Sequence, residues 1–178
     1  MFSSKFSQVK VKLPKPFTDQ KPGTSGLRKS TLRFQEQHYL ESFVESIFRT
    51  LPGVNGGTLV LGGDGRYGNK RAIDTILRMA AAHGIQKVIT TFDGVLSTPA
   101  ASHLIRINKA IGGIILSASH NPGGLSGDFG VKLNGSNGGP ASESTTDEIY
   151  NFSKKLNEYN IVECQSISSF SVGTYELA

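Results

Sequence analysis

A serine followed by a histidine stands at the centre of the segment whose residue types could do chemistry. Ser119 and His120 lie in the run Ser117-Ala-Ser-His-Asn-Pro-Gly-Gly124, directly after an apolar stretch. A serine hydroxyl beside an acid/base side chain can act as a nucleophile or carry a phosphoryl group. The proline and glycines favour a tight turn whose backbone N–H groups can approach an anion. The alternative is an ordinary Asn-Pro-Gly-Gly turn with a surface histidine.

A second polar segment precedes it in the chain, from Lys21 to Lys29. It combines small residues and hydroxyls with two cations at its end, and its candidate phosphate-binding residues are Thr24, Ser25, Gly26, Arg28 and Lys29. An arginine fork and free backbone amides are suited to a phosphate group. The alternative is a flexible basic linker.

Two further charged residues lie near glycines, in or next to predicted strands. Lys132, in a strand just beyond the serine loop, could point back into the same site, where a desolvated lysine between cations can act as a general acid or base. The alternative is an ordinary strand lysine that faces solvent. Asp64, in Gly62-Gly-Asp-Gly-Arg66, is predicted to hold a loop at the start of a helix.

Hydrophobic periodicity indicates the elements that must position these residues. Strands are predicted around residues 9–13, 58–61, 87–91, 112–117, 129–134 and 170–178, and helices over 36–51, 72–80, from Thr98 onward and over 142–158. Thr98 is expected to cap its helix, with Pro99 at the first helical position. Residues 14–30 are predicted to form a loop. Alternating strands and helices imply an α/β fold with a mostly parallel central sheet.

Composition and charge restrict the function classes. The 178 residues carry a net charge of +5, but residues 1–33 hold eight Lys and Arg against Asp19 alone, and the remainder is slightly acidic. A basic surface for nucleic acid is therefore disfavoured, and residues 1–33 lack interleaved aromatic side chains. A single cysteine, Cys164, excludes an intrachain disulfide, and the absence of a long apolar run predicts no membrane span. We expect a cytoplasmic protein.

Seven segments together resemble the first domain of the phosphoglucomutases in the α-D-phosphohexomutase superfamily. They occur in the family's order and cover most of residues 21–160: Lys21–Lys29, Gly62–Arg66, Leu96–Ala100, Ile111–Leu116, Ser117–Gly124, Gly127–Lys132 and Asn137–Ala141. The resemblance implies a three-layer α/β/α domain with a mixed, mostly parallel sheet. It also implies two parts, an N-terminal strand and basic segment over 1–20 and the phosphoserine domain over 21–178.

The resemblance assigns roles to the candidate residues. Ser119 corresponds to the serine that carries the transferable phosphoryl group, and His120 to its neighbour that contacts substrate and phosphate. Arg28 corresponds to the arginine beside the phosphoserine loop, and Lys132 to the proposed general acid/base. Ser117 stands where many relatives have threonine.

The implied reaction interconverts glucose 1-phosphate and glucose 6-phosphate through glucose 1,6-bisphosphate. The implied metal is Mg²⁺, bound to a phosphoryl oxygen on Ser119 and to aspartates of a loop that this chain lacks, since it has no Asp-Gly-Asp-Gly-Asp run. Family enzymes are longer, with metal, sugar and distal phosphate loops beyond the first domain. We therefore expect a partner in the remaining domains of one polypeptide, and little or no activity from this chain alone.

A different functional class also fits the resemblance. Some relatives, of the parafusin type, are phosphoproteins of regulated secretion and trafficking. Under that interpretation, the domain is an interaction module controlled by phosphorylation.

Overall fold

A five-stranded mixed sheet forms the centre of the molecule. The computed structural model describes residues 7–23, 25–164 and 173–174. The strands lie in the order β2, β6, β5, β3, β4. Their bounds are β2 Leu27–Ser30, β3 Thr58–Gly63, β4 Lys87–Ile89, β5 Gly112–Leu116 and β6 Asp128–Gly135. Only β6 runs against the others, because it is antiparallel to both β5 and β2, while β3 is parallel to β4 and β5. The predicted mixed, mostly parallel sheet is confirmed.

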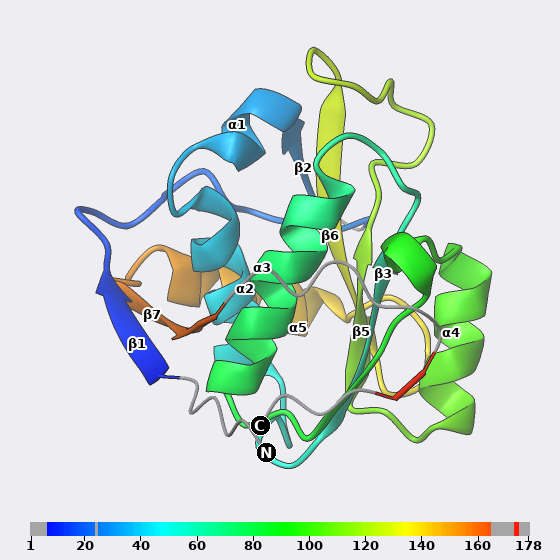
Figure 1. Cartoon of the computed structure of the whole chain (residues 1–178). Coiled ribbons are helices and arrows are strands. Elements are labelled where there is room, and N and C mark those ends of the chain that lie inside the picture. The colour runs from blue at the N-terminus through cyan, green and yellow to red at the C-terminus, as the bar shows by residue number, and fades with distance from the viewer. Residues whose placement is uncertain (1–6, 24, 165–172, 175–178) are drawn as a thin grey trace.

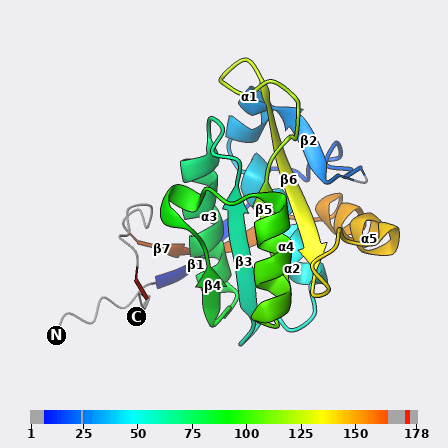
Figure 2. The ribbon, with the colours of Figure 1, turned by 90° about the vertical axis from the view of Figure 1, so that its right-hand side faces the viewer.

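Helices cover both faces of this sheet, as Figure 1 shows. Their bounds are α1 Thr31–Gln35, α2 Tyr39–Thr50, α3 Asn69–Ala82, α4 Thr98–Ile107 and α5 Glu143–Ser153, with a short 3₁₀ turn, η1, over Phe92–Gly94. Helices α2 and α3 pack on one face and α4 on the other, where it lies in front of the strands in Figure 2. The three-layer α/β/α architecture is therefore confirmed.

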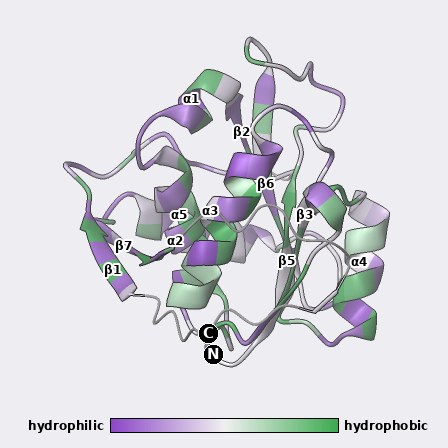
Figure 3. Cartoon of the chain, viewed as in Figure 1, coloured by the Kyte–Doolittle hydropathy of each residue, from purple (hydrophilic) through white to green (hydrophobic). Residues whose placement is uncertain are grey.

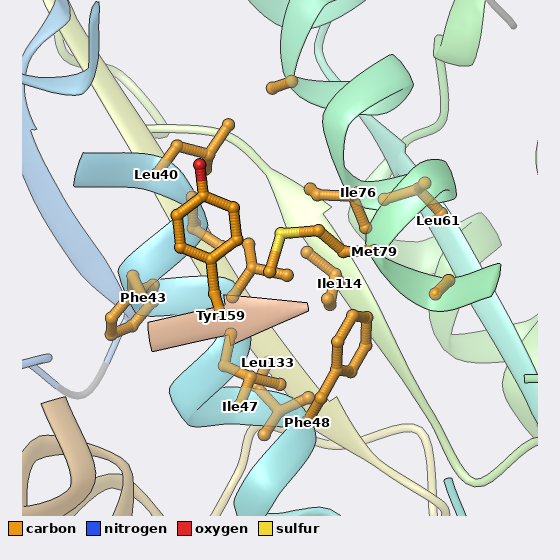
Figure 4. Close-up of a cluster of buried hydrophobic side chains, with 14 of the residues drawn as sticks. Leu40, Phe43, Ile47, Phe48, Leu61, Ile76, Met79, Ile114, Leu133 and Tyr159 are labelled. Atoms are coloured by element: carbon orange, nitrogen blue, oxygen red, sulfur yellow. The ribbon is translucent and has the colours of Figure 1, made fainter. Parts of the chain in front are cut away.

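Alternation along the strands explains the two layers of core. In β3, Leu59 and Leu61 join the larger core against α2 and α3, whereas Val60 joins the smaller core against α4. The sequence of a strand that is covered on both faces is a continuous run of apolar residues, rather than an alternation of apolar and polar ones. Figure 3 shows apolar colour along β3 and β5, and Figure 4 shows side chains from α2, α3 and the sheet meeting in the larger core.

A separate two-stranded ribbon lies beside α3. It pairs β1, Ser7–Lys12, antiparallel with β7, Glu158–Glu163. Tyr159 and Ile161 of β7 are buried in the larger core, so the ribbon is attached to the main domain. Leu13, which follows β1, is buried in the same core. The division of the chain at residue 20 stays a prediction.

Three sequence expectations need correction. Residues 27–30, predicted as loop, form strand β2, and the helix predicted over 142–158 ends at Ser153, so that β7 begins at Glu158. The N-cap of α4 is Ser97 rather than Thr98, because the Ser97 hydroxyl accepts from the Ala100 amide over 3.3 Å. The strand predicted over 170–178 falls almost wholly outside the described residues.

Among the described residues, no helix combines the length and apolar character needed to cross a bilayer.

Candidate functional site

Three strands bring the candidate residues together. Ser119 lies three residues beyond the carboxyl end of β5, Arg28 lies in β2, and Lys132 lies in β6 between these two strands. Arg28 is paired with Gly130, which is two residues from Lys132. Side chains alternate along a strand, so Arg28 and Lys132 leave the same face of the sheet. That face is the one covered by α4, since Lys132 is paired with Ile115 of the smaller core.

Two cationic side chains converge on one hydroxyl oxygen. The Arg28 guanidinium donates from Nη2 to Ser119 Oγ over 2.8 Å. The Lys132 ammonium donates from Nζ to the same oxygen over 3.0 Å. Ser119 itself is exposed, so a ligand can reach this oxygen. Preorganised positive charge around an exposed hydroxyl stabilises negative charge that develops on it or on a group attached to it.

The electrostatic surroundings change the acidity of Lys132. Partial burial lowers the pKa of its ammonium, and the nearby charges of Arg28 and Arg66 lower it further, against an opposing effect of Asp64. A lowered pKa increases the neutral fraction of a lysine, which can then accept a proton. Lys132 Nζ thus lies within hydrogen-bond distance of Ser119 Oγ, and its surroundings favour the neutral amine more than water does.

The serine loop is fastened at its beginning to the end of β3. The Ser119 amide donates to Ser117 Oγ over 2.9 Å, and the Ser117 hydroxyl donates to Asp64 Oδ2 over 2.7 Å. Asp64 also accepts from Arg66, whose Nη2 reaches the Ser119 carbonyl over 3.2 Å. The prediction that Asp64 holds a loop agrees with these contacts, but the helix itself begins later, with Gly68 as N-cap.

The far end of the same loop is fastened to the start of α1. Thr31 donates from its hydroxyl to the Gly124 carbonyl and from its amide to the Gly127 carbonyl, each over 2.8 Å. Within the loop, the Asn121 amide group donates to Asp128 over 2.8 Å. Because Thr31 directly follows β2, the strand of Arg28 and the loop of Ser119 are held by one junction.

The loop before β2 is a tight turn against β6. Gly23 and Gly26 exchange two backbone hydrogen bonds of 3.0 Å each. Gly26 has a φ of +86°, and a Cβ at this position would lie 2.4 Å from the Val131 carbonyl oxygen. Glycine is thus required for the turn to meet β6 and lead into β2. Ser25 is exposed at the turn, and Thr24 lies outside the described residues.

Lys29 is not brought to Ser119. It follows Arg28 in β2, so its side chain leaves the opposite face of the strand. There its ammonium lies 3.8 Å from the Asp19 carboxylate, which also accepts from Arg33. The contact joins β2 to Asp19, which precedes the turn that leads into this strand.

His120 lies beside Ser119 and is exposed. None of the hydrogen bonds among the described residues involves its ring. Its role as a substrate contact stays a prediction.

Sequence reasoning missed the role of Arg66. Its side chain is only 8% exposed, and its guanidinium donates to the carbonyls of Ser119 and Asp128 as well as to Asp64. Two of these partners are backbone atoms, which leave no signature in a sequence. One feature of the sequence could have indicated this role: Arg66 follows a glycine-rich turn at the end of a buried strand.

Comparisons with known proteins identify the family of the chain. The family model described as "Phosphoglucomutase/phosphomannomutase, alpha/beta/alpha domain I" matches residues 19–160. Curated phosphoglucomutases include one from Aspergillus fumigatus, 54% identical over 89% of this chain and 29% of its own length, and one from Rhizobium radiobacter, 52% identical over 91% of this chain and 30% of its own length.

Solved structures show the same likeness. The Paramecium exocytosis-sensitive phosphoprotein pp63/parafusin, titled a phosphoglucomutase in its open form, superposes with a TM-score of 0.87 at 46% identity, over 89% of this chain and 29% of that one. A Thermus thermophilus protein titled a phosphomannomutase gives a TM-score of 0.63 at 27% identity, over 83% of this chain and 31% of that one. The chain spans under a third of the length of these relatives. It belongs to the phosphoglucomutase/phosphomannomutase family, of which it comprises the alpha/beta/alpha domain I.

Proposed function

We propose that Ser119 is the phosphoryl carrier of a phosphoglucomutase that interconverts glucose 1-phosphate and glucose 6-phosphate through glucose 1,6-bisphosphate. The observation that carries the proposal is the convergence of Arg28 and Lys132 on Ser119 Oγ, at 2.8 and 3.0 Å. The names of the most similar relatives supply the reaction class.

The chemistry follows from these contacts. Ser119 Oγ attacks one phosphorus of the bisphosphate, its proton passes to neutral Lys132, and an O–P bond forms. The bond between that phosphorus and the sugar oxygen breaks, and the proton held by Lys132 passes to the sugar oxygen, which becomes a hydroxyl. Arg28 stabilises the charge on the transferring group, which is the main requirement of phosphoryl transfer. In the other half of the cycle the reverse sequence applies: phosphorylated Ser119 transfers its phosphoryl group to the free 6-hydroxyl of glucose 1-phosphate, which gives the bisphosphate. Loss of the 1-phosphoryl group of that bisphosphate to Ser119 then leaves glucose 6-phosphate.

The remaining candidates form an outer set around this centre. We expect His120 to contact the sugar phosphate, and the turn of Ser25 and Gly26 lies beside Lys132 of β6. Thr24 stays a predicted phosphate contact. Lys29, held at Asp19, acts at a distance by fixing the strand that carries Arg28.

Mg²⁺ binding would require ligands from outside this chain. Among the described residues, no three His, Cys, Asp or Glu side chains gather into a group that could hold a metal ion. The chain's own contribution would be a phosphoryl oxygen on Ser119. We expect the remaining domains of the family's longer polypeptides to supply the other ligands and most of the sugar contacts, so that turnover by the chain alone is slight.

Labelling of the serine tests the proposal. The chain is incubated with glucose 1,6-bisphosphate, and phosphoryl groups are counted by intact mass and located by peptide mapping. We expect one group, on Ser119, which Ser119→Ala abolishes. Ser126→Ala is the matched control, because Ser126 is an exposed serine of the same loop. No label on Ser119, in the chain alone or joined to a relative's remaining domains, would overturn the proposal.

A second candidate function is a phosphorylation-controlled interaction module in secretion or trafficking. It is favoured by the likeness to the Paramecium protein, whose title calls it an exocytosis-sensitive phosphoprotein. Label from ATP and a cell extract on residues other than Ser119, with none from the bisphosphate, would favour this function.

A further inference from the structure

Ser119 holds a backbone conformation that needs an explanation. Its φ is +55°, in the left-handed region that few residues other than glycine adopt. Such a conformation persists only where its surroundings impose it. The backbone conformation of Ser119 helps to set the direction of its Oγ. The contacts that impose this conformation therefore also affect how Arg28 and Lys132 meet that oxygen.

The Ser117 hydroxyl is the first constraint. Ser117 is 7% exposed, and its Oγ accepts the Ser119 amide over 2.9 Å while donating to Asp64 Oδ2 over 2.7 Å. A hydroxyl has a single hydrogen. Once that hydrogen is given to Asp64, the lone pairs of Ser117 Oγ are left for the Ser119 amide.

Arg66 is the second constraint. It donates from Nε to both Asp64 oxygens over 2.9 and 3.0 Å, and from Nη2 to Asp64 Oδ2 over 2.8 Å. The same Nη2 donates to the Ser119 carbonyl over 3.2 Å. The Ser119 amide and the Ser119 carbonyl are therefore both held, one through Ser117 and one through Arg66.

The charge of Arg66 allows the Asp64 carboxylate to lie near the proposed phosphoryl carrier Ser119. Burial disfavours the charged form of Asp64, but hydrogen bonds from Arg66 and Ser117 outweigh it and hold its pKa below the usual range. Asp64 is therefore an ionised acceptor at neutral pH, and the Arg66 charge offsets its repulsion of a phosphoryl group on Ser119.

We propose that Asp64 and Arg66 are positioning residues for Ser119. They fix the direction of the Ser117 hydroxyl, and this hydroxyl keeps Ser119 in the conformation that presents Oγ to Arg28 and Lys132. The inference deepens the proposed role of Ser119 and rests on it only for the consequence in phosphoryl transfer.

Amide exchange of Ser119, followed by NMR, tests the positioning directly. In Ser117→Ala and Asp64→Ala, we expect the exchange rate of the Ser119 amide to rise about fivefold, the loss typical of one hydrogen bond. Ser117→Thr keeps a hydroxyl and should restore the slow rate. Asp93→Asn is the matched control, because Asp93 also forms an ion pair, with Lys70 over 3.0 Å, but does not contact Ser119.

The result that overturns the inference is an unchanged Ser119 amide in folded Ser117→Ala, or failure of Ser117→Thr to restore its protection. Should Ser117→Ala not fold, as judged by circular dichroism, Asp64→Ala replaces it, because alanine leaves no acceptor for the Ser117 hydroxyl. An unchanged Ser119 amide in that variant would equally overturn the inference.

Phosphoryl uptake supplies a second readout. In Ser117→Ala, we expect the maximal rate of Ser119 labelling to fall about tenfold, while the bisphosphate concentration that gives half this rate stays within about twofold, because the cations remain in place. An equal loss in both parameters would indicate a general structural role and contradict positioning. If the unmodified chain is never labelled, the proposed function fails, but amide exchange still decides the positioning.

Discussion

Arg28 and Ser119 are 91 positions apart in the sequence, and the Arg28 guanidinium donates directly to Ser119 Oγ over 2.8 Å. The contact depends on β6, which pairs with the strand of Arg28 on one side and with the strand leading to Ser119 on the other.

Replacement of Arg28 by methionine should slow phosphoryl transfer to Ser119. Loss of one preorganised donor to a developing charge costs about 100-fold in rate. Labelling kinetics with glucose 1,6-bisphosphate measure the effect. Arg71→Met is the control, because Arg71 is an exposed arginine on α3. Labelling of Arg28→Met at the unmodified rate would show that the guanidinium does not assist the transfer.

Lys132 should impose a pH dependence on the labelling rate. Burial and the charge of Arg28 lower the pKa of its ammonium, so the neutral amine becomes populated below the usual pH range of lysine. The rate should rise with pH until Lys132 is deprotonated and then level off. Lys132→Arg keeps the positive charge but cannot lose its proton, so its profile should be slower and flat over this range. An unchanged rise in Lys132→Arg would assign the proton to another group.

Gly130→Ala should destabilise the domain, because a Cβ at this position would lie 2.3 Å from the Ser117 carbonyl oxygen. Such overpacking lowers the free energy of unfolding by about 1–3 kcal/mol. Urea unfolding of Gly130→Ala measures it. In the same strand, a Cβ on Gly135 would come no closer than 3.6 Å to its neighbours, so Gly135→Ala is the matched control. Equal free energies of unfolding of the two variants would contradict this prediction, because they would show that the strands make room for a Cβ at Gly130 without loss of stability.

Glu45→Gln should also destabilise the domain. The Glu45 side chain is fully buried in α2 and accepts from Arg49 over 2.8 Å, from His83 over 2.7 Å and from the Asn160 amide over 3.1 Å. An amide in its place turns one acceptor oxygen into a donor group. We expect a loss of about 2–4 kcal/mol in urea unfolding. Glu148→Gln, at an exposed position of α5, should be neutral.

The same carboxylate predicts a dependence of stability on pH. Burial disfavours its charge, but His83 and Arg49 outweigh burial and hold the pKa of Glu45 below its ordinary value of 4.5. A depressed folded pKa stabilises the native state above the unfolded pKa, and this contribution is lost as pH falls through the folded value. The stability difference between the unmodified chain and Glu45→Gln should therefore shrink below about pH 4.5. A constant difference would mean that Glu45 is not the titrating group.

The sequence predicted the elements with a strong hydrophobic period and missed those without one. Strand β5 and helix α2 were predicted almost at their observed bounds. Strand β2 was missed because Leu27, Arg28, Lys29 and Ser30 show too little apolar alternation, and pairing with β6 makes them a strand. Strand β7 was missed because a helix pattern precedes it directly.

For the site, residue types identified Ser119, Arg28 and Lys132 as candidates, and the structure brings them together. Lys29 was grouped with Arg28 because loop residues have no defined face. Within a strand the two point to opposite sides. Arg66 was missed because it acts partly on backbone carbonyls, which every residue possesses.

The place of β6 between β2 and β5 has a consequence for synthesis of the chain. Strand β2 emerges from the ribosome long before β6, with which it pairs at the edge of the five-stranded sheet. During translation, the strand of Arg28 cannot pair with β6 until residues 128–135 have left the exit tunnel. The contacts of Arg28 and Lys132 with Ser119 Oγ are therefore absent from every shorter nascent chain, and a polypeptide truncated before this point cannot form them.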